Sequence, residues 1–308
     1  MSEIEIKSCD KLYGNFHALN NLSLNVGKGQ IFAYLGPNGA GKTTTIKLLL
    51  GLIKPSSGEV KILNMDPYND NEKSIKNKQK IGVMLDSPAL YLDLTGFENL
   101  VYWAELYGLN SKKANKIADK LLKKLKLHDW RDNKVLEYSH GMKKRLSFAR
   151  AIVHDPEILI LDEPTNGIDF ESRELIRNLI EKLFEEEKTI FFSSHDLGEV
   201  QKICTHLAII NKGKMIFHGE LKDLEHEFSM NKMFIVLKNE KAVKKFINNR
   251  ENMIIEPKVD GTTVSFIYAK QDIDLKSEDI ITYWIEKTSL EDYYKKIIAC
   301  DQNEHQSN

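Results

Sequence analysis

The sequence is poor in cysteine, and neither sign of charge dominates it. Cys9, Cys204 and Cys300 are isolated thiols without CxxC or other metal-ligand spacing, which suits a reducing compartment and argues against a zinc site or a disulfide framework. The formal net charge is −1, with 44 Lys and Arg against 45 Asp and Glu. Nucleic-acid-binding domains usually carry a basic stripe, so we expect no nucleic-acid partner.

Long hydrophobic runs are also missing. No stretch approaches the ~18 apolar residues that a membrane-spanning helix needs. The N-terminal residues alternate Ile4 and Ile6 with charged side chains, which predicts a first strand and not a signal peptide. We found no internal repeat and no low-complexity segment. If the protein serves a membrane, we expect it to act from outside the lipid.

The 308 residues allow one large domain and a smaller one. Strand-like and helix-like stretches alternate through residues 1–220, which predicts an α/β core. Within it, helical patterns indicate a helical insert over about residues 87–155. It includes a helix that begins with a capping box at Thr95 and Glu98, and a lysine-rich helix over residues 111–127.

Residues 221–308 read as a small α+β unit. A strand-like stretch near residue 235 and a short lysine-rich helix precede a hairpin that turns at Asp260 and Gly261. A last helix is predicted to be capped by Ser289 and Asp292. No motif with visible chemistry lies in this segment, so we interpret it as an accessory domain that aids stability, dimerisation or regulation.

A glycine-rich phosphate loop follows a buried strand and precedes a helix. It fits G-x-x-x-x-G-K-[ST] in full over Gly36, Pro37, Asn38, Gly39, Ala40, Gly41, Lys42 and Thr43. Glycines let backbone N–H groups close on the β-phosphate of a bound nucleotide, and Lys42 can bridge its β- and γ-phosphates. The Thr43 hydroxyl can ligate Mg²⁺, and Thr44 is placed for another phosphate oxygen at the positive end of the helix.

Two more buried strands end in polar residues that suit the same chemistry. Asp162 ends the run ILIL and can ligate Mg²⁺ directly or through water. Glu163 is the candidate for polarising the attacking water, and His195, after the next strand, could contact the γ-phosphate. Paired carboxylates can also merely cap a helix, and a lone histidine is usually structural. The phosphate loop in the same chain favours the catalytic interpretation.

A second candidate anion site lies at Ser139 and Gly141, directly ahead of an apolar-periodic helix. Together with YSHGM and PTNGID, the motifs resemble the ATP-binding subunit of an ATP-binding-cassette (ABC) transporter, over about residues 3–220. The resemblance implies an α/β P-loop NTPase fold with a helical subdomain, ATP and Mg²⁺ as cofactors, and ATP hydrolysis. It also matches His195 to the switch histidine and Tyr13 to the aromatic residue that stacks on adenine.

In that family two such domains pair head to tail around ATP. The resemblance therefore implies that Ser139, Gly141 and Asp169 contact the nucleotide held by a second copy or by a different ATPase subunit. It further implies a separately encoded membrane permease, and a cytoplasmic, peripheral location on the inner face of the cell membrane.

Two positions depart from the common family pattern. Asp86 stands where the family usually has the glutamine of the Q-loop, and a carboxylate can ligate Mg²⁺ but cannot donate as an amide does. We expect Asp86 to be both catalytic and a metal ligand. His140 and Met142 replace a Gly and a Gln of the common signature motif, whereas Ser139 and Gly141 are retained.

The acidic Q-loop, the signature YSHGM, PTNGID and the closing SLEDYY segment most resemble the bacitracin-resistance and lantibiotic-immunity branch, which exports peptide antibiotics. Related ATPases serve polysaccharide, sodium or other drug exporters. A low-turnover regulatory ATPase is an alternative that rests on Asp86 alone. A soluble ATPase acting on DNA or ribosomes is disfavoured, because the chain has one cassette and no heptad stretch.

The apolar loop 87–97 suggests a docking surface for the permease, unless Leu90, Leu92 and Phe97 simply pack in the core.

Overall fold

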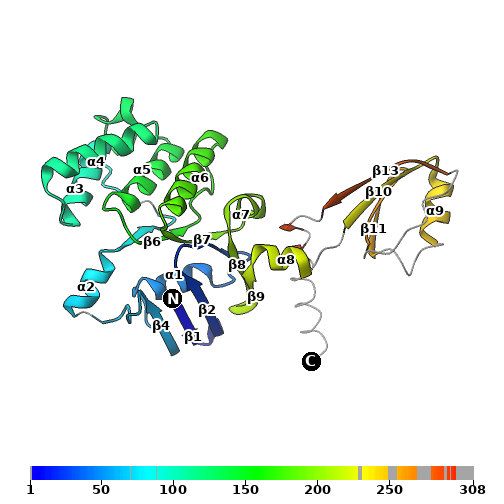
Figure 1. Ribbon diagram of the computed structural model, residues 1–308, viewed down its shortest axis with the longest axis horizontal. Coiled ribbons are helices and arrows are strands. Elements are labelled where there is room, and N and C mark those ends of the chain that lie inside the picture. Colours follow the sequence, from blue (N-terminus) through cyan, green and yellow to red (C-terminus); the bar gives the residue numbers. More distant parts are fainter. Residues whose placement is uncertain are drawn as a thin grey trace. The chain divides into compact units, whose positions relative to one another are not determined.

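The computed structural model of the chain (Figure 1) describes residues 2–69, 71–87, 89–227, 231–248, 255–268, 279–287, 290–291 and 293–295. The predicted caps Ser289 and Asp292 lie outside these residues. The chain divides into two compact units, Met1–Leu221 and Lys222–Asn308. No helix among the described residues has both the length and the apolar character needed to cross a lipid bilayer.

The first unit is built on a six-stranded sheet with the order β5-β6-β7-β3-β8-β9. Its strands are β3 (Ile31–Leu35), β5 (Ile81–Met84), β6 (Ile158–Asp162), β7 (Thr189–Ser194), β8 (His206–Asn211) and β9 (Lys214–Glu220). All neighbours pair in parallel except β8 and β9, which form an antiparallel hairpin that turns at Lys212 and Gly213. Every residue of β3, β6 and β7 is buried, because a parallel sheet is covered on both faces.

A smaller antiparallel sheet covers one face of this core. It has the order β2-β1-β4 and consists of β1 (Ser2–Tyr13), β2 (Phe16–Gly27) and β4 (Ser57–Ile62). Helix α1 (Lys42–Leu49) contacts β2 and β4 of this sheet and β6 of the larger one. Ile46, Leu48 and Leu49 of α1 join one apolar core with residues of both sheets, so the first turn of α1 is held firmly at the sheet edge.

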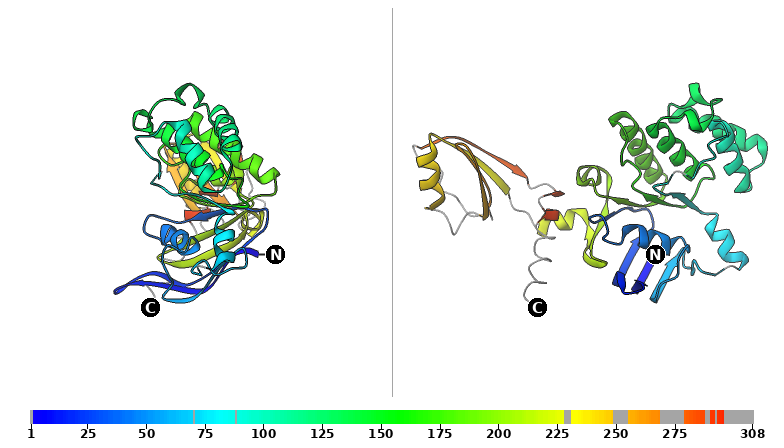
Figure 2. Two further views of the ribbon diagram at one scale, coloured as in Figure 1. Left: turned by 90° about the vertical axis from the view of Figure 1, so that its left-hand side faces the viewer. Right: turned by 180° about the vertical axis from the view of Figure 1, so that it is seen from behind.

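Helices gather on the opposite side of the large sheet (Figure 2). They are α3 (Gly96–Leu106), α4 (Ser111–Lys124), α5 (His140–Ile152) and α6 (Phe170–Glu185), with the short turns His128–Trp130 and Val135–Glu137. Helix α2 (Glu72–Lys78) lies apart from this group, on the side of the small sheet, and α7 (Leu197–Ile203) follows β7 (Figure 1). The predicted capping box is confirmed: Thr95 Oγ1 accepts from the Glu98 N–H at 3.1 Å, and Glu98 Oε2 accepts from the Thr95 N–H at 2.8 Å.

The prediction of a helix over residues 111–127 is wrong at its end. Helix α4 stops at Lys124 with Leu125 as its C-cap. Lys126 then adopts φ +54°, a left-handed conformation that ends a helix. Leu125 and Leu127 are nonetheless fully buried, so the apolar pattern continues through the turn and imitates a longer helix.

The second unit contains a four-stranded antiparallel sheet of order β11-β12-β10-β13. Its elements are α8 (Leu221–Glu227), β10 (Asn231–Leu237), α9 (Glu240–Asn248), β11 (Ile255–Asp260), β12 (Thr263–Tyr268) and β13 (Ile280–Lys287). The predicted hairpin at Asp260 and Gly261 joins β11 to β12. Side chains of β10, β12 and α9, among them Ile235, Phe246 and Phe266, form a separate core.

Candidate functional site

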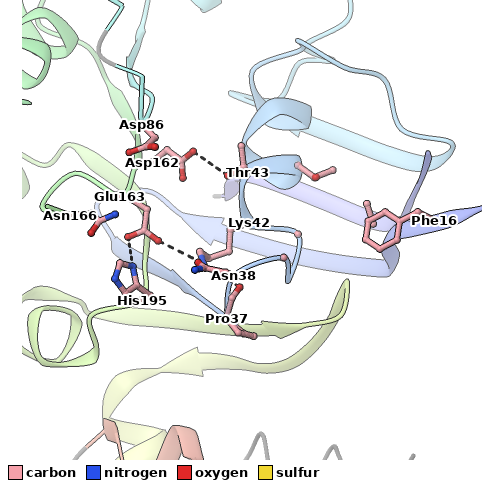
Figure 3. Close-up of a pocket in the computed structure, with 14 residues that line it drawn as sticks. Phe16, Pro37, Asn38, Lys42, Thr43, Asp86, Asp162, Glu163, Asn166 and His195 are labelled. Atoms are coloured by element: carbon pink, nitrogen blue, oxygen red, sulfur yellow. Dashed lines mark hydrogen bonds and ion pairs between the residues drawn. The ribbon is translucent and has the colours of Figure 1, made fainter. Parts of the chain in front are cut away.

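A pocket of about 500 Å³ lies where the loop before α1 meets the carboxyl ends of β5, β6 and β7 (Figure 3). Parallel strands end at one edge of the sheet, and polar groups placed there converge. The pocket is lined by these predicted site residues: Pro37, Asn38, Gly39, Gly41, Lys42, Thr43, Thr44, Asp86, Asp162, Glu163 and His195. Phe16 and Ala18, which were not predicted as site residues, and Asn166 of the PTNGID motif also line it.

The phosphate loop packs so closely that two of its glycines leave no room for a side chain. A Cβ on Gly36 would lie 2.4 Å from the Ile210 carbonyl oxygen, and one on Gly41 would lie 2.8 Å from that of Ala18. Gly41 also has φ +111° and is the N-cap of α1. The loop is therefore fixed by its neighbours on β2 and β8, and the free N–H groups of the first turn of α1 can bind an anion.

Lys42 is held in place inside the pocket. Its Nζ donates to the Gly36 carbonyl oxygen at 2.7 Å and lies 3.6 Å from Glu163 Oε1. Only 7% of the residue is exposed. Because the Lys42 ammonium is already buried and fixed by acceptors, it can interact with a negatively charged phosphate without first losing conformational freedom.

Thr43 and Asp162 offer the oxygen ligands that Mg²⁺ prefers. Thr43 Oγ1 donates to Asp162 Oδ2 at 3.3 Å, and the buried Asp162 accepts from Ser193 Oγ at 2.6 Å through its other oxygen. Within the described residues, no group of three or more His, Cys, Asp or Glu could hold a metal ion. Mg²⁺ usually takes one or two protein oxygens together with phosphate and water, so Thr43 and Asp162 fit it.

Glu163 and His195 meet on the other wall of the pocket. Their side chains share a hydrogen bond of 2.9 Å between Glu163 Oε2 and His195 Nδ1 (Figure 3). The Glu163 backbone adopts φ +49°, a conformation that is rare for a side chain of this kind and is often found at functional sites. Its N–H donates to Ser193 Oγ at 3.0 Å. One hydroxyl, that of Ser193, therefore orients both carboxylate residues.

Asp86 reaches the pocket from the segment after β5, and 70% of its side chain is exposed. It is paired with Lys144 of α5, whose Nζ lies 3.2 Å from Asp86 Oδ1 and donates to the Glu163 carbonyl oxygen at 3.0 Å. Lys144 was not predicted as a site residue. Lys144 stands between Lys143 and Arg145 in the sequence, so no local pattern marks it as the buried residue of the three.

Tyr13 is not among the residues that line the pocket. Tyr13 and Phe16 are opposite one another across the β1–β2 hairpin, and Phe16 is the one that lines the pocket. The Lys11 ammonium lies 5.0 Å from the centre of the Tyr13 ring. Phe16 is 63% exposed, so an aromatic face is available beside the phosphate loop.

The predicted trans contacts Ser139, Gly141 and Asp169 also lie outside this pocket. Ser139 caps α5, and its Oγ accepts from the Met142 N–H at 3.2 Å. Asp169 caps α6 and accepts from the Ser172 N–H at 2.9 Å and from its hydroxyl at 2.8 Å. These hydrogen bonds lower the pKa of Asp169. A Cβ on Gly141 would lie 2.9 Å from Asp169 Oδ2, so the two helix starts touch.

Comparison with known proteins agrees with this geometry. The sequence pattern of the ABC transporter family matches residues 19–166. The chain is 35% identical over 303 residues to the bacitracin transport ATP-binding protein BcrA of Bacillus licheniformis, covering 96% of this chain and 97% of that protein. It is 38% identical over 221 residues to the linearmycin resistance ATP-binding protein LnrL of Bacillus subtilis (strain 168), covering 72% and 70% respectively.

Solved structures with the same fold include a dimer of the ATP-binding cassette MJ0796 in a post-hydrolysis state bound to ADP and phosphate. The TM-score is 0.66 at 28% sequence identity, and the match covers 71% of this chain and 98% of that one. The predicted fold class is confirmed.

Proposed function

Because the chain belongs to the family of ABC transporter ATP-binding proteins, we propose that it hydrolyses ATP to drive export of an antibiotic through a separately encoded membrane permease. The observation that carries this proposal is the convergence of Lys42, Thr43, Asp162 and Glu163 on one pocket. A phosphate cradle, a metal-binding pair and a candidate base are the parts that phosphoryl transfer to water requires.

Each residue has a role in this reaction. Lys42 and the N–H groups of the phosphate loop bind the β- and γ-phosphates. Thr43 and Asp162 would hold Mg²⁺, which neutralises phosphate charge when it is bound. Glu163 accepts a proton from the attacking water as its oxygen bonds to the γ-phosphorus and the bond to the β–γ bridging oxygen breaks, giving ADP and phosphate. His195, which is hydrogen-bonded to Glu163, orients that carboxylate, and Asp86 would provide a further oxygen ligand for Mg²⁺.

We further propose that two copies, or this chain and a related ATPase subunit, close around ATP. Ser139 is exposed at the start of α5, whereas Gly141 is buried two residues later, and both lie outside the chain's own pocket. The Ser139 hydroxyl and the backbone at this helix start would contact the γ-phosphate held by a partner. Asp169 stands beside Gly141 and would join the same contact. The solved dimer of the similar cassette MJ0796 supports this arrangement.

An apolar groove on the first unit supports the proposal that a membrane permease is a second partner of this chain. Its volume is about 260 Å³, and its lining includes Leu52, Pro67, Val83, Leu85 and Tyr107. The groove therefore adjoins the segment that leads to Asp86. Of the apolar loop 87–97, Tyr91 and Leu92 are exposed, whereas Leu90 and Phe97 are half-buried.

Helix α3 carries two further exposed apolar residues: Tyr102, whose ring centroid lies 5.0 Å from that of Tyr91, and Leu106, which directly precedes Tyr107 of the groove. An apolar segment from a cytoplasmic loop of the permease fits this surface. Docking there would connect permease movement to Asp86 and would place the subunit at the inner face of the cell membrane, where cytoplasmic ATP is available.

The cargo is proposed from how much of this chain each antibiotic-transport relative matches. The match to the bacitracin transport protein runs through 96% of this chain, and therefore through most of the second unit, whereas the match to the linearmycin resistance protein covers 72%. A peptide antibiotic of the bacitracin or lantibiotic kind is the class we propose. Polysaccharide, sodium or another drug is the alternative cargo.

Co-purification of the tagged chain from solubilised membranes, followed by an antibiotic challenge, tests the proposal. We expect a polytopic membrane protein to co-purify, and cells expressing both proteins to tolerate more bacitracin or lantibiotic than cells expressing the pair with Lys42→Ala. Absence of ATP hydrolysis by the chain, both alone and with its membrane partner, would refute the ATPase role. Hydrolysis without antibiotic tolerance would refute only the cargo.

A further inference from the structure

Lys144 is the most completely buried charged side chain near the pocket. It lies on α5, five residues after Ser139, and its side chain is 1% exposed. Ordering and desolvating an ammonium group is costly unless it is paired and hydrogen-bonded. The two partners of Lys144 therefore explain why the residue can be buried at all.

Both partners belong to the proposed hydrolytic site. Lys144 Nζ lies 3.2 Å from Asp86 Oδ1 and 3.0 Å from the carbonyl oxygen of Glu163. The first contact holds the carboxylate that replaces the usual Q-loop amide. The second holds the peptide unit that follows the strained φ of Glu163, so it resists relaxation of that residue.

We propose that Lys144 is a positioning residue for ATP hydrolysis, which ties the start of α5 to Asp86 and Glu163 so that the three move together. This inference rests on the proposed function. It also gives a reason for the aspartate at position 86: a buried lysine in α5 needs an anionic partner, and an amide in that place would leave the ammonium charge uncompensated.

A second cation on the same helix reinforces this connection. Arg150, also on α5 and largely buried, donates from Nη2 to the Val83 carbonyl oxygen at 2.8 Å. Its guanidinium carbon lies 4.9 Å from the centre of the Trp103 ring on α3. Lys144 and Arg150 thus hold the segment from Val83 to Asp86 at two points, and movement of α5 is passed to that segment.

The ion pair also has a consequence for metal binding. If Asp86 contributes to a Mg²⁺ site, the Lys144 ammonium shares its carboxylate and repels the metal ion. Replacing Lys144 by an uncharged residue should therefore strengthen Mg²⁺ binding while loosening Glu163. These two effects have opposite signs, which a simple packing defect does not produce.

The test compares Lys144→Gln, Asp86→Gln and the double variant with the wild type in the full chain. Lys143→Gln is the matched control, since Lys143 is the preceding residue of α5 and donates to the Leu136 carbonyl oxygen instead. Two quantities are measured: the Mg²⁺ concentration that gives half of the ATP-dependent rise in melting temperature, and the steady-state rate of phosphate release.

For Lys144→Gln we expect the Mg²⁺ midpoint to fall about threefold to tenfold and turnover to fall about tenfold or more. Asp86→Gln should lower the melting temperature by leaving Lys144 unpaired, and adding Lys144→Gln should recover much of that loss. Because the double variant removes both charges of the pair, it should fold and can be compared with the wild type even if a single variant folds poorly. Lys143→Gln should match the wild type in both quantities.

An unchanged Mg²⁺ midpoint in Lys144→Gln, or melting-temperature losses that simply add in the double variant, would overturn the inference. If the wild type hydrolyses no ATP with or without its membrane partner, the proposed function fails. In that case the Mg²⁺ midpoint and the melting temperatures still decide whether Lys144 controls Asp86.

Discussion

Glu163 combines a charged side chain with a left-handed backbone, φ +49°, and the surrounding residues hold it there. The Ser193 hydroxyl accepts from its N–H, Lys144 donates to its carbonyl oxygen, and His195 bonds its carboxylate. Such a conformation costs about 1–3 kcal/mol. The three contacts offset this strain and hold the carboxylate in the pocket. A group that must accept a proton from a water molecule at a fixed point needs such a fixed position.

Replacing Glu163 by Gln should lower the rate of ATP hydrolysis by about 10²–10⁴-fold, because the amide cannot accept the proton of the attacking water. ATP binding should persist, since the phosphate loop is unchanged, and an ATP-bound dimer should accumulate in size-exclusion chromatography. Glu181→Gln on the exposed side of α6 is the control and should behave as the wild type. Persistent monomers at saturating ATP would contradict the shared-site arrangement.

The two aromatic residues of the β1–β2 hairpin can be separated by experiment. Phe16 lines the pocket and Tyr13 does not, so Phe16→Ala should weaken ATP binding more than Tyr13→Ala. Stacking on a base contributes about 1–3 kcal/mol, which corresponds to about fivefold to 150-fold in affinity. Fluorescent-nucleotide titration measures both variants. The reverse order would restore Tyr13 as the adenine contact that the family resemblance implies.

The sequence identified the residues that form continuous motifs and missed those that reach the site through the fold. Lys42 and Glu163 stand in patterns whose chemistry is evident from spacing. Ser193, Lys144 and Phe16 act only because β7, α5 and the β1–β2 hairpin come together in space. A serine at a strand end, a helical lysine and a hairpin aromatic are common elsewhere, so one sequence does not distinguish them.

Helix α5 contributes functional groups along its whole length. Ser139 caps the start of α5. Further along the helix, Lys144 is paired with Asp86, and Arg150 donates to the carbonyl oxygen of Val83. His154 lies just after the end of the helix. The ring of His154 stacks on that of Tyr107, with centroids 3.6 Å apart and planes 5° apart. Since Tyr107 also lines the apolar groove, the end of α5 supports the surface proposed for the permease.

Stability should depend on pH through His154. Burial lowers the pKa of His154 from 6.5 to about 4, so between these values the unfolded chain binds a proton that the folded chain does not. Stability is therefore lost as pH falls below about 6.5, by about 2 kcal/mol at pH 5. His154→Phe preserves ring stacking and removes the titration. Its melting temperature should fall less than that of the wild type between pH 7.5 and pH 5; equal falls would refute this.

The secondary-structure elements predicted best are the fully buried strands, whose short apolar runs fit no other element. The apolar runs of β3, β6 and β7 are short, flanked by polar residues and rich in residues that favour strands, and all three strands are found. The end of α4 was predicted less well, because Leu125 and Leu127 are buried in a turn and extend the helical pattern. Register and strand order depend on long-range pairing, which local patterns do not contain.

Among the described residues, each unit has an apolar core of its own. All residues that line the nucleotide pocket belong to the first unit. A chain truncated after residue 221 should therefore still bind ATP, with an affinity within about threefold of the full chain, by isothermal titration calorimetry. Loss of binding in a truncated chain that keeps a cooperative melting transition would show that the second unit supports the pocket.

If each pocket needs Ser139 and Gly141 of another copy, hydrolysis per subunit should depend on protein concentration. Specific activity should fall on dilution, with the rate approaching the square of concentration where monomers dominate. Phosphate release over a dilution series, compared with sedimentation at the same concentrations, measures this. Constant specific activity at clearly monomeric concentration would mean that one chain hydrolyses ATP unaided.

The position of β3 in the middle of the large sheet also has a consequence for synthesis on the ribosome. The small sheet β2-β1-β4 is complete by Ile62, but the strands that pair with β3 come much later in the chain: β7 begins at Thr189 and β8 at His206. At about 5–20 residues per second, the growing chain waits roughly 8–30 s for β7. During this interval Ile31–Leu35 is an unpaired apolar strand, so slow translation of the helical segment should promote aggregation and increase the need for chaperones.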